Sequence, residues 1–424
     1  MPERCYLLTG ASGFLGREIL CEIARREPEA RIYAPLRAPV GDLERRVAAL
    51  GWRSAATRAV AISGDLTRLR AGLSPRDVER VTGEVTHVVH AGASVRFDED
   101  VHRSRQVNVH GTRQLLELAQ RAKRLERFVL VSTAFVGGER AGVLLEGPAP
   151  PGRFRNTYER TKWEAEELAR RAMASLPVTV VRPSIIAPSL QHGGSHPSLD
   201  RVAASSSNGT RARASAADDE PRARFLMLLR LYLTHGWRWV PGTPGSIVDL
   251  VSADLVARAT LALAHRPLSD GRWYHLAAGP RASTLREVGD IASRTFRAPP
   301  LSFAPPRLFR AALRLLVWGR AKPMLDRAAP YVPYLSVRTR IDTTDSHRVL
   351  RELGIEVPRV ADVFADLLAI LRERGDWSSA PSRSAASVAA PPRPPVRFDA
   401  GGEARVSAGR DDAAPPRRAL ERRS

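Results

Sequence analysis

Short apolar runs alternate with amphipathic stretches along the first half of the chain. Stretches with apolar residues on one side predict helices at 14–25, 107–122 and 158–174. The apolar runs before and between them predict strands at 5–8, 31–36, 60–63, 87–91, 128–132 and 178–182. Such an alternation implies a parallel sheet with helices on both faces. The pattern therefore predicts an α/β fold, a doubly wound Rossmann-type parallel sheet, with a smaller and mostly helical C-terminal part that binds substrate.

The pattern changes after Pro188 and divides the chain. Residues 1–189 form the predicted Rossmann domain, whereas 190–222 are rich in Ser, Ala, Gly and Arg and predict a flexible insertion. Residues 223–377 are expected to bind substrate and to supply the remaining Rossmann elements. An Arg-, Pro- and Ala-rich tail at 378–424 is expected to be disordered.

Three segments of the C-terminal half carry further apolar patterns. Residues 225–233 are apolar on most sides, which is compatible with core, with the lining of an acyl tunnel, or with contact to a membrane surface. Residues 308–318 mix arginines with apolar residues, so they are either core or an interfacial helix. Residues 348–374 predict two helices separated by Pro358.

Composition limits the kinds of partner and location. The chain has 424 residues, 43% of them hydrophobic, and no uncharged apolar run of about 18 residues or leader-like segment before the first strand. We therefore expect a cytoplasmic protein, with peripheral contact to a membrane as an alternative. Cys5 and Cys21 are expected to be small buried hydrophobes, without a disulfide or a metal. The sequence does not determine the oligomeric state.

The net charge of +21 comes from arginines spread along nearly every predicted helix. Nucleic-acid binding needs clustered cations, so we expect no nucleic-acid partner. The charge remains compatible with anionic substrates such as CoA thioesters, or with an acidic carrier protein.

Tyr158 and Lys162 form the most informative pair. Of 66 Lys and Arg residues, only Lys123, Lys162 and Lys322 are lysine, which makes a lysine four residues after a tyrosine unexpected by chance. Positions i and i+4 share a helix face, so the ammonium can lower the pKa of the tyrosine hydroxyl. The pair predicts a proton-transfer site, with an incidental surface pair as the alternative.

A glycine-rich segment, Thr9-Gly10-Ala11-Ser12-Gly13-Phe14-Leu15-Gly16, follows the first predicted strand and opens the first helix. Glycines there permit a tight turn and close approach of backbone N–H groups to a pyrophosphate, and the helix N-terminus favours negative charge. The segment predicts dinucleotide binding by Gly10, Ser12, Gly13, Phe14, Leu15 and Gly16.

Later strand ends complete the predicted cofactor site. Arg37 follows the second strand, where an acid would hold the ribose hydroxyl of NADH, so we predict NADPH. Asp65, followed by Leu66, ends the third strand and can bond the adenine amino group. Small residues, Ala91, Gly92 and Ala93, end the fourth strand and let the backbone pass beside the cofactor.

Together these motifs resemble the extended short-chain dehydrogenase/reductase superfamily over roughly residues 5–190. The shared motifs are the TGxxGxxG loop, Gly64-Asp65-Leu66, His90-Ala91-Gly92-Ala93, Asn108-Val109-His110-Gly111-Thr112, a hydroxyl residue at a strand end, YxxxK and Arg182-Pro183-Ser184. The resemblance implies that Thr133 positions the substrate carbonyl, that Tyr158 is the general acid, and that Lys162 binds nicotinamide ribose hydroxyls. It also implies that Asn108 holds the helix geometry and a water of the proton relay.

Further segments are similar to the fatty acyl-CoA reductase and thioester reductase group, whose NAD-binding domain is male-sterility-like. They are residues 32–38, Ala93-Ser94-Val95-Arg96-Phe97-Asp98-Glu99, Val131-Ser132-Thr133-Ala134 and residues 247–254. The resemblance implies reduction by NADPH of a fatty acyl thioester, as acyl-CoA or on an acyl-carrier protein, to aldehyde or further to alcohol. A sterol or lipid alcohol dehydrogenase and a nucleotide-sugar epimerase or dehydratase are the alternatives, and a redox-sensing binding protein is the rival outside enzymes.

Overall fold

The computed structural model describes residues 3–38, 58–189, 229, 232–233, 238–267, 273–304 and 329–373. The predicted insertion at 190–222, the tail at 378–424, the segment at 308–318 and most of 225–233 lie outside the described residues.

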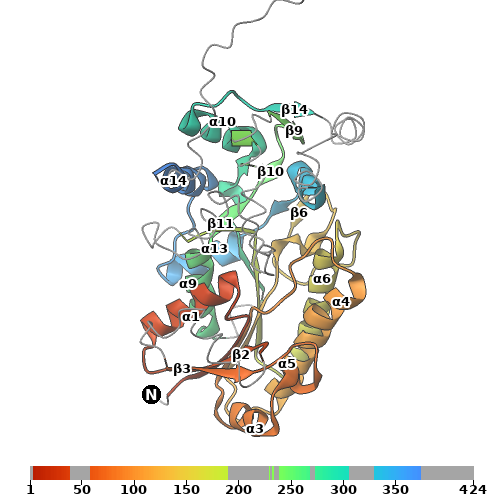
Figure 1. Cartoon of the computed structure of the whole chain (residues 1–424), viewed down its shortest axis with the longest axis vertical. Coiled ribbons are helices and arrows are strands. Elements are labelled where there is room, and N and C mark those ends of the chain that lie inside the picture. Colours follow the sequence, from red (N-terminus) through yellow and green to blue (C-terminus); the bar gives the residue numbers. More distant parts are fainter. Residues whose placement is uncertain are drawn as a thin grey trace, which may run out of the picture. The chain divides into compact units, whose positions relative to one another are not determined.

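A seven-stranded sheet forms the centre of the fold, and every neighbouring pair of its strands is parallel (Figure 1). The strand order β12-β7-β5-β4-β1-β2-β3 confirms the predicted doubly wound Rossmann-type sheet. Its strands are β1 (Cys5–Thr9), β2 (Arg31–Leu36), β3 (Arg58–Ser63), β4 (His87–His90), β5 (Arg127–Val131), β7 (Val178–Pro183) and β12 (Trp273–Leu276).

Helices cover both faces of this sheet (Figure 1). On one face lie α1 (Phe14–Arg26), α9 (Ala253–Ala264) and α13 (Thr344–Glu352), and on the other α3 (Pro75–Glu84), α5 (Gly111–Gln120) and α6 (Thr157–Ala172). Strand β1 shows how the sequence builds both layers. Tyr6 and Leu8 enter the core with α1 and α9, whereas Cys5 and Leu7 enter the core with α3 and α5. This two-sided burial explains the continuous apolar runs in the sequence.

A smaller group of elements packs around a third core beyond the strand ends (Figure 1). Helices α10 (Leu285–Phe296) and α14 (Val360–Glu373) pack together there beside short strands. These strands are β8 (Ile185–Ala187), β9 (Trp239–Pro241), β10 (Ile247–Val248), β11 (Leu250–Ser252), β13 (Ser283–Thr284) and β14 (Ser302–Ala304). The short helix η8 (Ala329–Ser336) borders the same region.

The remaining elements are short and connect the sheet to its helices. They are the helical turns η3 (Leu69–Gly72), η5 (Ala134–Gly137) and η7 (Gly279–Arg281), helix α4 (Val101–Arg105), the π-helical turn η4 (Gln106–His110) and the strand pair β6 (Val143–Leu144) and β15 (Arg340–Ile341).

The sequence predictions agree with six of the seven strands of the main sheet and with helices α1, α5, α6, α13 and α14. All six predicted strands are present, and the two helices predicted around Pro358 are α13 and α14. Helices α3, α9 and α10 and strand β12 were not predicted. The expectation for Cys21 was wrong, because it lies on the exposed side of α1, whereas Cys5 is buried in β1, and both are free thiols. Within the described ranges, no helix is long and apolar enough to cross a membrane and no side-chain cluster suits a metal ion.

Candidate active site

One cavity of about 1230 Å³ lies at the carboxyl ends of the parallel strands. The predicted catalytic residues Thr133, Tyr158 and Lys162 line it, and Asn108 does not. Every predicted cofactor-binding residue also lines it, namely Gly10, Ser12, Gly13, Phe14, Leu15, Gly16, Arg37, Asp65, Leu66, Ala91, Gly92 and Ala93. The topology therefore brings together motifs that are far apart in the sequence.

The glycine-rich loop is closely packed and fits an anion. Gly10 has φ +76°, and a Cβ there would lie 2.6 Å from the backbone nitrogen of Gly92 and 2.7 Å from the carbonyl carbon of Ala91. Helix α1 begins after Gly13, which caps its N-terminus without a side chain, and the first turn holds no acid. Its first N–H groups are therefore available to a pyrophosphate.

Arg37 and Asp65 lie at the predicted adenosine end of the cavity. The carboxylate of Asp65 accepts hydrogen bonds from the backbone nitrogen (2.9 Å) and hydroxyl (2.8 Å) of Thr67. Partial burial opposes ionisation, but these hydrogen bonds and the charges of Arg37 and Arg68 lower the pKa of Asp65. Asp65 is therefore a fixed, ionised acceptor beside an exposed arginine.

His90 holds the fourth strand end in place. Its ring nitrogens are hydrogen-bonded to the hydroxyls of Thr9 (2.7 Å) and Thr112 (3.0 Å). Burial, with a smaller effect of the Lys162 charge, lowers the pKa of His90 to about 3. The neutral ring therefore links β4 to β1 and α5, and the Thr9 hydroxyl also accepts from the nitrogen of Gly92 (3.2 Å).

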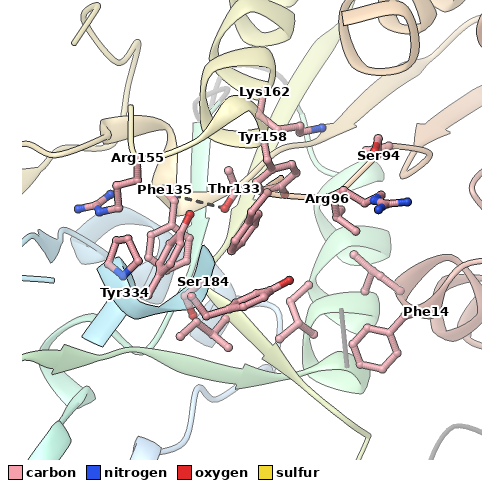
Figure 2. Close-up of a pocket in the computed structure, with 18 of the residues that line it drawn as sticks. Phe14, Ser94, Arg96, Thr133, Phe135, Arg155, Tyr158, Lys162, Ser184 and Tyr334 are labelled. Carbon is pink, nitrogen blue, oxygen red and sulfur yellow. Dashed lines mark hydrogen bonds between the residues drawn. The ribbon is translucent and has the colours of Figure 1, made fainter. Parts of the chain in front are cut away.

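Thr133 and Tyr158 come from different elements and meet in the cavity (Figure 2). Thr133 follows β5 and caps η5 by accepting a hydrogen bond from the nitrogen of Phe135 (3.3 Å). Tyr158 lies in the first turn of α6, which begins there because Asn156 caps it by accepting from the nitrogen of Glu159 (3.0 Å). Burial raises the pKa of the Tyr158 hydroxyl, against a hydrogen bond with Thr133.

Lys162 is 2% exposed and its Nζ donates to the carbonyl oxygen of Val131 at 2.7 Å. Burial lowers the pKa of Lys162 to about 8, and Glu166 opposes that shift. In this arrangement burial raises the pKa of Tyr158 and the Lys162 ammonium is bonded to the end of β5, so the lowering of the Tyr158 pKa by Lys162 stays a prediction. An ammonium has three donors, so two remain for a ligand.

Asn108 is buried behind the cavity, in the π-helical turn η4. Its Oδ1 accepts from the nitrogen of Ser94 (2.7 Å), and its Nδ2 donates to the Ser94 carbonyl (2.9 Å) and the Thr161 hydroxyl (2.9 Å). Both ends of the amide are therefore used to join the loop after β4 to α6. We infer that Asn108 positions this loop, and its expected water in a proton relay stays a prediction.

A buried ion pair lies one helical turn beyond Lys162 on α6. The Arg182 guanidinium of β7 donates to both carboxylate oxygens of Glu166 on α6, at 2.9 and 2.6 Å, and its third nitrogen lies 3.1 Å from Nε2 of His275 on β12. Arg182 has no exposed surface. The pair is bidentate, so it fixes α6 against the sheet four residues beyond Lys162.

Sequence reasoning missed an aromatic wall beside Tyr158. Phe97 packs against the rings of Tyr158 (centroids 5.7 Å apart), Tyr331 (4.8 Å) and Tyr334 (5.1 Å). Figure 2 shows Tyr334 and Arg155 on one side of Tyr158 and Arg96 on the other. The segment that carries Tyr331 and Tyr334 lacks the apolar period of an amphipathic helix or a strand, so no local signal indicated its place.

The hydroxyl of Tyr334 connects this wall to the catalytic helix. It donates to Oε1 of Glu159 (2.6 Å) and accepts from Nδ2 of Asn156 (2.8 Å), while the guanidinium of Arg155 also bonds Glu159 (3.1 Å). Glu159 is fully buried, and burial raises its pKa although Arg155 and Tyr334 oppose the shift.

Ser132 was also missed as a residue of the cavity. Its buried hydroxyl has no hydrogen-bond partner within the described part of the chain. That hydroxyl is therefore available to a ligand, one residue before Thr133.

The far side of the cavity is apolar. Its lining comes from β8, β9, β10, α10 and α14, and includes Ile185, Val240, Ile247, Leu285, Val288, Ala292, Leu301 and Phe364. The same cavity thus extends from a polar, glycine-lined end, past Thr133 and Tyr158, to an apolar end that can accommodate a hydrocarbon chain.

The fold and the Thr133, Tyr158 and Lys162 arrangement define a protein of the extended short-chain dehydrogenase/reductase class. The NAD-binding family model described as male sterility protein matches residues 8–260. The chain therefore belongs to the NAD-binding male sterility protein family.

The chain is similar in sequence to fatty acyl-CoA reductases. Fatty acyl-CoA reductase 1 of Xenopus laevis is 32% identical over 219 residues, which are 42% of this chain and 42% of that protein. Fatty acyl-CoA reductase 1 of Rattus norvegicus is 28% identical over 341 residues, 70% of this chain and 62% of that protein. The chain thus matches less than two thirds of the length of these relatives.

A solved structure resembles the chain over most of its length. It is the crystal structure of the terminal R domain from the myxalamid PKS-NRPS biosynthetic pathway, with a TM-score of 0.70 and 28% identity, covering 88% of this chain and 92% of that one.

Proposed function

We propose that this protein is an NADPH-dependent reductase that converts fatty acyl thioesters to aldehydes and free thiol. The observation that carries the proposal is the continuous cavity, which joins the glycine-rich loop, the hydroxyls of Thr133 and Tyr158, and an apolar chamber. The family and the similarity to fatty acyl-CoA reductases support the same substrate class.

Thr133 and Tyr158 are the proposed groups for the thioester carbonyl. Two hydroxyl donors side by side can hold the oxygen while negative charge develops on it. A reduced nicotinamide dinucleotide, when bound, supplies the hydride to the carbonyl carbon. The raised pKa keeps Tyr158 protonated at neutral pH, so its hydroxyl can give a proton to the oxygen. The resulting hemithioacetal releases thiol and aldehyde.

Lys162 and Arg37 are proposed to bind the cofactor, and Arg37 to select NADPH over NADH. Lys162 has donors left for the nicotinamide ribose hydroxyls after its bond to Val131. Arg37 is exposed at the end of β2, on the cavity, where a guanidinium attracts the 2′-phosphate of NADPH. Asp65 is proposed to accept from the adenine amino group.

The acyl group is proposed to arrive as acyl-CoA or on a separate acyl-carrier protein, and its chain to occupy the apolar end of the cavity. A single hydride transfer gives aldehyde, and a second one gives alcohol. The ratio of NADPH consumed to thiol released distinguishes these products, since it is one for aldehyde and two for alcohol.

The test is an incubation of the purified protein with NADPH and palmitoyl-CoA, in which free thiol, aldehyde and alcohol are measured. We expect thiol release that depends on NADPH and is lost in Tyr158→Phe, which removes the proton donor and leaves the ring. No thiol release from palmitoyl-CoA or a palmitoyl-carrier protein would exclude the proposal. Oxidation of a sterol or long-chain alcohol with NADP⁺, without thiol chemistry, would favour a lipid alcohol dehydrogenase.

A further inference from the structure

We propose that Arg140 and Arg338 form a binding site for the phosphate of a phosphopantetheine arm at the edge of the cavity. The inference rests on the proposed function and names the part of the thioester that these residues recognise. Both arginines line the same cavity as Thr133 and Tyr158.

The strand pair β6 and β15 brings the two arginines together from distant parts of the sequence. The hydroxyl of Thr339, next to Arg338, donates to the carbonyl oxygen of Arg140, and the nitrogen of Arg340 donates to the carbonyl oxygen of Gly142 at 2.8 Å. The two backbones are thus bonded to each other beside both arginines. A site built from both segments exists only when β15 has paired with β6.

The charges around the cavity single out these two arginines. Arg96 lies 3.8 Å from Asp98, Arg103 lies 3.4 Å from Glu99, and Arg155 is bonded to Glu159. Arg37 belongs to the adenosine end with Asp65. The other cavity-lining arginines therefore have a carboxylate nearby.

Arg140 and Arg338 have no carboxylate partner among the residues that the structure describes. The Arg140 guanidinium donates to the carbonyl oxygens of Pro150 (3.3 Å) and Pro151 (3.4 Å), which orient it without neutralising it. Glu139, the acid beside Arg140, is paired with Arg153 at 3.5 Å. Two guanidinium groups that line one cavity, neither paired with a carboxylate, are suited to donate hydrogen bonds to the oxygens of one phosphate.

The length of chain between Thr133 and Arg140 is compatible with the length of an acyl-pantetheine thioester. The phosphate of this group is separated from the sulfur by the pantetheine chain, so its cation must lie away from the carbonyl site. The seven residues from Thr133 to Arg140 can span at most roughly 25 Å, and the turn η5 shortens that distance. Arg338 is exposed, so a phosphate there keeps part of its hydration.

Three substrates with one acyl chain separate phosphate recognition from the chemistry. They are palmitoyl-CoA, palmitoyl-4′-phosphopantetheine and palmitoyl-pantetheine, of which the last lacks phosphate. For the double variant Arg140→Gln/Arg338→Gln we expect kcat/KM to fall about tenfold or more with the first two and to stay unchanged with the third. Unchanged turnover of palmitoyl-pantetheine also shows that the variant is folded.

Arg340→Gln is the matched control, because Arg340 is an exposed arginine of the same strand pair that does not line the cavity. It removes one positive charge and should leave all three kcat/KM values unchanged. An equal loss with all three substrates, a loss with palmitoyl-CoA alone, or no loss in the double variant would each overturn the assignment. If the wild-type protein releases no thiol from any of the three, the proposed function itself has failed.

Discussion

The hydroxyl of Tyr334 donates a hydrogen bond to the buried carboxylate of Glu159 at 2.6 Å, and this bond joins η8 to the turn of α6 that carries Tyr158. Because Glu159 follows Tyr158 directly, the position of the catalytic helix start depends on a segment more than a hundred residues away. The aromatic wall of the cavity and the helix turn that carries Tyr158 are thereby joined by a buried hydrogen bond.

Tyr334→Phe keeps the ring against Phe97 but removes this hydrogen bond. We expect a loss of about 1–3 kcal/mol in the free energy of unfolding, because Glu159 and Asn156 each lose a partner. We also expect kcat to fall while the KM for NADPH stays constant, since the glycine-rich loop is not touched. Urea unfolding and steady-state kinetics measure the two effects. In a double-mutant cycle with Glu159→Gln the effects should not add, and strict additivity would show that the two residues act independently.

Arg37→Asp places an acid where a 2′-phosphate is expected. The carboxylate repels that phosphate, so kcat/KM with NADPH should fall by about a factor of ten or more, and NADH should be favoured relative to the wild type. Equal kcat/KM for NADH and NADPH in the wild-type protein would contradict the proposed cofactor preference. So would unchanged NADPH use by Arg37→Asp.

The pKa of Lys162 predicts an alkaline limit on cofactor binding. Burial lowers that pKa from 10.5 to about 8, so the folded protein loses the ammonium charge as the pH rises through about 8. Affinity for NADPH should therefore weaken between about pH 7 and about pH 9. Lys162→Arg keeps its charge over that range, so its binding should be weaker overall and free of this limit. A limit of the same size in Lys162→Arg would assign the titration to another group.

Three buried histidines predict a loss of stability in mild acid. Burial lowers the pKa of His87 and His90 to about 3 and that of His275 to about 4, from 6.5. At a pH between the folded pKa values and the ordinary value of 6.5, these histidines are protonated in the unfolded chain and neutral in the folded protein. The free energy of unfolding therefore falls as the pH falls below about 6.5. At pH 5 the loss is on the order of 2 kcal/mol for each histidine.

The measurement is the urea midpoint at about pH 7 and about pH 5. His87→Gln removes one titrating group, and it should reduce the difference between the two midpoints. An unchanged difference would mean that His87 titrates with its ordinary pKa in the folded protein, and a larger difference would mean that its pKa is raised there.

Local sequence signals predicted residues that meet at the glycine-lined end of the cavity. The glycine-rich loop, Asp65 and Ala91-Gly92-Ala93 each stand at a strand end, and parallel strands bring their carboxyl ends together. Tyr158 and Lys162 were found because residues four apart share a helix face. The bond of Lys162 to Val131 was not predicted, because helix spacing fixes the origin of a long side chain and not the direction in which its end points.

The aromatic wall and the arginine pair depend on contacts between distant segments. Tyr334 bonds Asn156 and Glu159, and Thr339, beside Arg338, bonds the carbonyl oxygen of Arg140, through pairings between segments far apart in the sequence. Strand β12 was missed because it is a four-residue strand whose identity depends on its pairing with β7. A single sequence does not indicate which distant segments pair with each other. It does indicate apolar periodicity and capping residues within one helix or strand.

Strand β12 and helix α9 follow Pro188, where the sequence pattern changes, yet they complete the sheet and one of its helical layers. A truncated protein that ends near Pro188 would expose the full hydrogen-bonding edge of β7, and would uncover the apolar faces of α1, β5 and β7 against which α9 packs. Such a fragment would contain every residue of the Thr133, Tyr158 and Lys162 set and still aggregate. The part of the chain that carries Thr133, Tyr158 and Lys162 therefore depends on elements that follow the change in sequence at Pro188.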